Sequence, residues 1–231
     1  MTTLTSDGLL TVAASLGVQT FPAVLALRPA HTDHDELAAA RAATVTTLCE
    51  RGVLDDSGDV LDDELTAALF TLARPDRELV MRIHRDDSLI RVCLARRDLD
   101  HALAVRTGDD LDVHTAWGDE DPEALARTLL TVLGQCPPAD LPALRVPTDE
   151  LQERFDADNA DYADAAYRLG MPESDAVALG LALRQCHSVA ELVCYSHRDG
   201  RPVRAPASTA IYDTPAGRII ASGSVAADGQ A

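Results

Sequence analysis

The stretch LTAALFTLARPDRELVMRIH, residues 65–84, contains the change of periodicity that decides the fold. Leu65, Leu69 and Leu72 repeat at the spacing of one helix face, and Pro75 ends that pattern because its ring blocks the helical backbone. Apolar and polar residues then alternate in four runs separated by Asp and Gly turns, at residues 78–84, 89–96, 101–107 and 111–116. Such short spacings are typical of hairpins. The stretch therefore predicts a helix followed by a four-stranded antiparallel meander.

Helices are predicted on both sides of this meander from apolar periodicity and end signals. Gly17 and Gly52 follow two of them, and Asp33 and Glu36 are spaced as a capping box. Phe21-Pro22 begins an extended link after the first helix. Asp121 precedes Pro122 in the pattern of an N-cap and first helical residue. The predicted helices span residues 5–16, 35–51, 62–73 and 121–133.

Prolines at 137, 138, 142 and 147 mark a boundary, after which the plan restarts. Two helices, at 148–169 and 173–185, lead into strands at 189–197, 203–213 and 217–225. The repeated order of helices and meander predicts an α+β fold with a duplicated antiparallel sheet. We expect one compact domain built from an N-terminal half (1–135), a Pro-rich link (136–147) and a C-terminal half (148–231). The second half lacks a closing helix, so residues 217–225 should expose an apolar edge.

Composition excludes several classes of function. The chain of 231 residues carries a net charge of -18, with 38 acidic against 20 basic residues, which argues against nucleic acid binding. It contains no lysine, so mechanisms that need a P-loop or Schiff-base lysine are impossible. Five widely spaced cysteines indicate free thiols. Without a signal peptide pattern or a long apolar run, we expect a cytoplasmic protein with no stable membrane insertion.

Three motifs carry a family resemblance, supported by the co-linear stretches 4–17 and 52–65. They are LTAALFTLARPDRELVMRI (65–83), LAVRTGDDLDV (103–113) and YDTPAGRII (212–220). In this order they resemble the ESX secretion-associated EspG family over nearly the whole chain. The resemblance implies a pseudo-twofold duplicated antiparallel sheet flanked by helical bundles. It also implies a shortened C-terminus, because family members continue past residues 228–229.

The functional implication is a non-enzymatic cytoplasmic chaperone of type VII (ESX) secretion. It would bind a PE/PPE heterodimer through the PPE partner and keep it soluble for export. The resemblance places docking on the central sheet, its loops and the C-terminal helical bundle. It implies no cofactor.

The predicted partner-binding residues lie in two polar hairpin tips and along sheet strands. The tips occupy corresponding places after the first strand of each meander, and loop tips on a rigid sheet suit recognition. Three arginines interrupt apolar alternations, where a partner could pair with a guanidinium. The predicted set is His84, Arg85, Asp86, Asp87, His197, Arg198 and Arg201 in the tips, with Arg82, Arg91 and Arg106 in the strands.

Other functions remain open at this point. A small hydrolase would need at least three of the His, Asp and Cys side chains to converge in one pocket. Cys194 with His187 and His197 is the best such trio, although an odd spacing places Cys194 and His197 on opposite strand faces. A paralogue that keeps the fold without a client is a third possibility. We expect no metal site, since turn and capping chemistry explains the acidic clusters.

Overall fold

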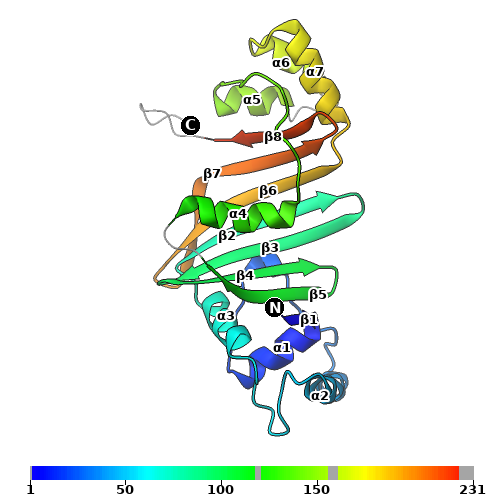
Figure 1. The fold of residues 1–231 in the computed structure, drawn as a ribbon, viewed down its shortest axis with the longest axis vertical. Coiled ribbons are helices and arrows are strands. Elements are labelled where there is room, and N and C mark those ends of the chain that lie inside the picture. The colour runs from blue at the N-terminus through cyan, green and yellow to red at the C-terminus, as the bar shows by residue number, and fades with distance from the viewer. Residues whose placement is uncertain (1, 118–120, 156–160, 224–231) are drawn as a thin grey trace. The chain divides into compact units, whose positions relative to one another are not determined.

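The computed structural model describes residues 2–117, 121–155 and 161–223. It is an α+β protein whose strands form an eight-stranded sheet in the order β1-β5-β4-β3-β2-β6-β7-β8 (Figure 1). This confirms the predicted fold class. The strands are β1 (Thr2–Thr5), β2 (Arg77–Arg85), β3 (Ser88–Arg97), β4 (Asp100–Thr107), β5 (Asp110–Ala116), β6 (Ser188–Arg198), β7 (Arg201–Thr214) and β8 (Gly217–Ser222).

The helices agree with most of the predicted ranges. Asp33 accepts hydrogen bonds from backbone N–H groups of the first turn of α2, as its spacing to Glu36 predicts, and Asp62 accepts one in the first turn of α3. The helices are α1 (Ser6–Ser15), the 3-10 turn η1 (Ala23–Leu25), α2 (His34–Glu50), α3 (Asp63–Ala73), α4 (Pro122–Leu133), α5 (Thr148–Phe155), α6 (Tyr162–Arg168) and α7 (Glu173–Arg184).

The chain divides into two compact units. The first unit comprises Met1–Arg82, Ser88–Leu133 and Cys194–Ala205, and the second comprises Ile83–Asp87, Gly134–Val193 and Pro206–Ala231. The predicted division into halves around residues 136–147 stays a prediction.

The core of the first unit lies between α3 and the strands β3, β4 and β5 (Figure 1). Leu65, Leu69 and Leu72 are fully buried there, which confirms the predicted apolar face of this helix. Ala95 of β3 stands opposite Ala102 of β4 in the sheet register. These two small side chains leave room for α3 to pack closely on the strands.

One buried apolar cluster of the second unit is packed against residues of the Pro-rich link. Ala166, Met171, Ala176 and Leu179 are buried between α6 and α7. Leu141 and Leu144 of the link and Ile219 of β8 pack against this cluster. The link is therefore part of the fold rather than a free connection.

The structure differs from the sequence prediction in three places. Thr2–Thr5 forms the strand β1, paired with β5, where no strand was predicted. The link after Phe21-Pro22 contains η1, which ends at Ala26 in the left-handed conformation (φ 48°). The predicted helix 148–169 is not continuous, because Asp161 is extended and N-caps a separate helix, α6. The Ala163 N–H donates a hydrogen bond to the Asp161 carboxylate, and this local bond competes with helix continuation there.

The predicted apolar edge is confirmed in part. β8 is the last strand in the sheet order, and the side chain of Ile220 is exposed. The outer edge of β8 is covered at Arg218, whose backbone donates a hydrogen bond to the Pro137 carbonyl and accepts one from the Ala139 N–H of the link. Residues 224–225 of the predicted strand lie outside the described residues.

Candidate functional site

The first hairpin tip joins β2 to β3 and belongs to the second unit. Asp86 adopts a left-handed conformation (φ 50°), which the tight turn requires. The side chains of His84, Asp86 and Asp87 are exposed, whereas Arg85 is half-buried. The structure therefore presents the predicted polar tip at the surface, and its binding role stays a prediction.

The second hairpin tip joins β6 to β7 and belongs to the first unit. Arg198 and Arg201 are exposed beside the turn at Asp199-Gly200. His197 differs, because its Nε2 lies 2.7 Å from Oε1 of the buried Glu78. A carboxylate removed from water needs such a partner, so this contact gives His197 a structural role.

Two of the three predicted sheet arginines contact the protein itself. Arg91 and Arg106 stand opposite each other in the register of β3 and β4. Arg91 donates to the Val24 carbonyl (3.3 Å), and Arg106 donates to the carbonyls of Leu25 and Ala26 (both 2.7 Å). These carbonyls belong to η1 and its end, so both arginines anchor that turn to the sheet. Arg82 is exposed.

The second unit also presents apolar side chains that sequence reasoning did not single out. Val177 and Leu181 lie four residues apart on α7 and are 48% and 57% exposed, and Tyr167 of α6 is 57% exposed. Residues four apart share a helix face. Apolar residues occur all around α7, so its periodicity did not distinguish this face from the buried one formed by Ala176 and Leu179.

Close packing of α6 against α7 holds this apolar face in place. A Cβ atom at Gly180 would lie 2.8 Å from the Ala163 backbone nitrogen, so only glycine allows the observed approach. The residues between the helices, Gly170–Pro172, place Met171 in the buried cluster between them. The exposed residues of α7 therefore stand on a closely packed helical pair.

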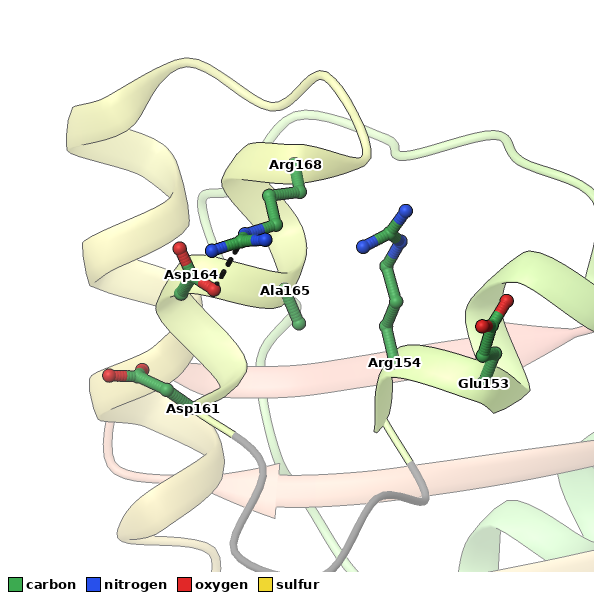
Figure 2. Close-up of a pocket in the computed structure, with 6 residues that line it drawn as sticks. All are labelled: Glu153, Arg154, Asp161, Asp164, Ala165 and Arg168. Atoms are coloured by element: carbon green, nitrogen blue, oxygen red, sulfur yellow. Dashed lines mark ion pairs between the residues drawn. The ribbon is translucent and has the colours of Figure 1, made fainter.

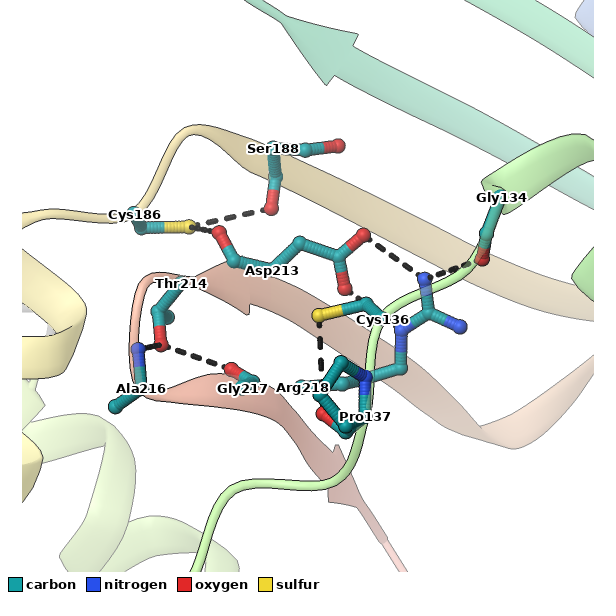
Figure 3. A network of polar contacts seen from close by, with 10 residues as sticks. All are labelled: Gly134, Cys136, Pro137, Cys186, Ser188, Asp213, Thr214, Ala216, Gly217 and Arg218. Atoms are coloured by element: carbon teal, nitrogen blue, oxygen red, sulfur yellow. Dashed lines mark hydrogen bonds and ion pairs between the residues drawn. The ribbon is translucent and has the colours of Figure 1, made fainter.

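A polar network ties the link to the end of the sheet (Figure 3). Arg218 donates to both carboxylate oxygens of Asp213, at 2.6 and 2.9 Å, and to the Gly134 carbonyl at 3.2 Å. The Arg218 hydrogen bonds hold the pKa of Asp213 below its ordinary value. Burial and the Asp213 charge raise the pKa of the Cys136 thiol, and burial raises that of Cys186. These thiols are thus poorly suited to nucleophilic chemistry at neutral pH.

Among the cavities formed by the described residues, two lie between helices. One of about 280 Å³ lies between α5 and α6 and is lined by charged residues and Ala165 (Figure 2). The other, of about 200 Å³, lies between α1 and α2. Neither is lined by a His or a Cys, so neither fits the convergent pocket that a hydrolase needs. In the part of the chain that the structure describes, no group of three His, Cys, Asp or Glu side chains could hold a metal ion.

Comparison with known proteins gives consistent matches. The EspG family model matches residues 5–231. The ESX-3 secretion-associated protein EspG3 of Mycolicibacterium smegmatis is 30% identical over 98% of this chain and 78% of its own length. The ESX-1 secretion-associated protein EspG1 of the same species is 28% identical over 94% of this chain and 75% of its own length.

The fold matches the Mycobacterium tuberculosis type VII secretion system chaperone EspG5, solved in complex with a PE25-PPE41 dimer. The TM-score is 0.75 at 23% sequence identity, over 96% of this chain and 86% of that chain. The architecture is thus that of an α+β protein with an eight-stranded sheet and packed helices. With the family match across nearly its whole length, this chain belongs to the EspG family. No helix among the described residues is long and apolar enough to span a membrane.

Proposed function

We propose that this chain is a non-enzymatic cytoplasmic chaperone of type VII secretion. It binds a PE/PPE-type heterodimer through the PPE partner and keeps the pair soluble for export. Family membership supports this proposal, as does the PE25-PPE41 dimer bound to the structurally similar EspG5. The structural observation that carries it is the exposed apolar face of α7, formed by Val177 and Leu181.

This face suits a chaperone because its side chains are apolar, exposed and closely supported. Exposed apolar residues that share a surface are a common mark of protein interaction sites. Covering an aggregation-prone tip of a partner requires apolar contact area, and Leu181 and Val177 offer it without rearrangement of the helical pair. The exposed residues His84, Asp86 and Asp87 belong to the same unit and would supply polar contacts.

Co-expression with PE/PPE pairs encoded in the same genome tests the proposal. We expect one pair to become soluble and to co-elute with this chain on size-exclusion chromatography. The variant Leu181→Glu should lose co-elution, because a charge would be buried against an apolar partner surface. Leu99→Glu is the matched control, since Leu99 is an exposed apolar residue of the first unit.

The outcomes separate the remaining alternatives. Loss with Leu181→Glu but not with Leu99→Glu supports docking on α7. Equal loss with both variants would count against the α7 surface. A folded chain that solubilises none of the pairs would favour a paralogue without a client.

A further inference from the structure

We propose that three arginines of the first unit, Arg77, Arg198 and Arg201, form a surface that binds an acidic segment of a partner protein. Arg77 begins β2, and Arg198 and Arg201 flank the turn between β6 and β7. All three are exposed, and we call them the arginine surface. The inference does not depend on the proposed function, because the docking face of α7 belongs to the second unit.

The turn of the second hairpin places Arg198 and Arg201 opposite each other. Asp199 and Gly200 both have positive φ, 52° and 72°, which is the backbone of a two-residue type I′ turn. In such a hairpin the residues on either side of the turn form a cross-strand pair. Their side chains lie on one face of the sheet, with Cβ atoms about 4.5–5.5 Å apart. The two guanidinium groups therefore reach one ligand together.

The contact between His197 and Glu78 shows that Arg77 lies on the same face as this pair. His197 Nε2 is 2.7 Å from Glu78 Oε1, so these two side chains share one face of the neighbouring strands β6 and β2. Successive side chains of a strand alternate between faces. Arg198 is next to His197 in β6 and points to the opposite face, and Arg77, next to Glu78 in β2, does the same. The His197 N–H donates to the Asp76 carbonyl at 2.8 Å, which places the end of β6 beside the start of β2.

The charge of the arginine surface is positive, although the chain as a whole carries a net charge of -18. The acidic residues next to these arginines in the chain are Asp76, Glu78 and Asp199. Asp76 Oδ2 accepts a hydrogen bond from the Asp98 N–H at 2.6 Å, and Glu78 contacts His197 on the other face. The exposed carboxylate of Asp199 therefore stands against three exposed guanidinium groups.

The arrangement is unfavourable for the protein on its own. Like charges directly opposite each other in a sheet are destabilising, and Arg198 stands opposite Arg201. The turn itself is specified by Asp199 and Gly200, whose positive φ values it requires. A carboxylate placed between the two guanidinium groups would replace their repulsion with charge-assisted hydrogen bonds.

An acidic protein segment fits this surface better than nucleic acid or an anionic membrane. Both of these are extended polyanions, which the net charge of -18 repels. A short segment responds mainly to charges within about 8 Å, the Debye length at physiological salt, so the exposed arginines decide its binding. Val203 adds an apolar contact, because it is 45% exposed and lies two residues after Arg201 on the same face of β7. The ligand class is therefore an acidic segment that carries an apolar residue.

Fluorescence anisotropy of a labelled glutamate-rich peptide with a central leucine tests the inference on the full chain. The variant Arg198→Gln/Arg201→Gln should bind the peptide about 2- to 30-fold more weakly than wild type, the range expected for the loss of two exposed ion pairs. The matched control is Arg28→Gln/Arg41→Gln, which removes two exposed arginines elsewhere in the first unit and the same net charge. It should keep the wild-type affinity. A peptide with glutamine in place of glutamate should bind none of these proteins.

Several results would overturn the inference. The wild-type chain could fail to bind the acidic peptide, or both double variants could weaken binding equally, which would reflect net charge alone. A melting temperature of Arg198→Gln/Arg201→Gln below that of wild type would show that these arginines are paired within the protein. We expect it to be unchanged or higher, because a repulsion is removed. Co-sedimentation with phosphatidylserine vesicles that the same substitutions abolish would assign the surface to a membrane instead. Co-elution with PE/PPE pairs tests the proposed function separately.

Discussion

Replacing Gly180 with alanine tests how closely α6 and α7 must pack. The new Cβ atom would lie 2.8 Å from the Ala163 nitrogen and 2.9 Å from the Ala163 Cβ. Carbon atoms prefer a separation of about 3.5–4.0 Å, so the helices would have to move apart by several tenths of an ångström. The clash involves backbone, which cannot rotate away as a flexible side chain can.

Two opposing effects decide the size of the change. Alanine is a better helix former than glycine by about 0.8–1 kcal/mol. Overpacking of a close contact costs about 1–3 kcal/mol, and a clash with backbone favours the upper part of that range. We expect a net destabilisation of about 1–2 kcal/mol, or a fall in Tm of about 2–8 °C for a chain of this size.

Urea unfolding followed by circular dichroism measures this difference. Ala178→Gly is the matched control, because Ala178 is exposed on the same helix and tests propensity without a clash. It should destabilise the protein by about 0.8–1 kcal/mol. If Gly180→Ala instead stabilises the protein by a similar amount, the helices are not in close contact and the reasoning is refuted.

Three further predictions concern the polar contacts. Arg218→Ala should lower the free energy of unfolding by about 3–5 kcal/mol, because it leaves the buried Asp213 carboxylate unpaired, and a urea midpoint equal to wild type would contradict this. The pKa of Asp213 in the folded protein lies below its ordinary value of 3.8. The ionised carboxylate therefore stabilises the folded protein above pH 3.8, and this stabilisation is lost as the pH falls through the folded pKa. Wild type should therefore lose more stability than Asp213→Asn in thermal scans below about pH 4. Arg106→Met should increase amide hydrogen exchange at Leu25 and Ala26, and unchanged protection there would exclude the proposed anchoring.

The sequence was informative wherever a local signal determines structure. Pro75 ends α3 whatever its surroundings, and Asp33 and Asp62 satisfy N–H groups that every helix start leaves free. Such signals predicted the meander and most helices. They also identified the exposed hairpin tip at Asp86, whose turn depends on neighbouring residues alone.

Features that depend on distant contacts were not predictable in this way. β1 is a strand because Leu4 pairs with Leu111, more than a hundred residues away. The contact of Arg106 with η1 could not be read from the sequence either, because its acceptors there are remote in the chain. Likewise, the exposed face of α7 follows from which side packs on Ala163, and periodicity alone does not contain that information.

The link and β8 help to hold the helical pair that carries the proposed docking face. Ala166, Met171, Ala176 and Leu179 form the buried cluster between these helices, and the stabilisation by burial scales with the apolar surface removed from water. The cluster gains further area from Leu141, Leu144 and Ile219, which reach it only because the link is fixed along β8. Arg218 fixes it twice, through backbone bonds to Pro137 and Ala139 and through its side chain to Gly134. The polar network therefore stabilises α6 and α7 indirectly, and their exposed face depends on it.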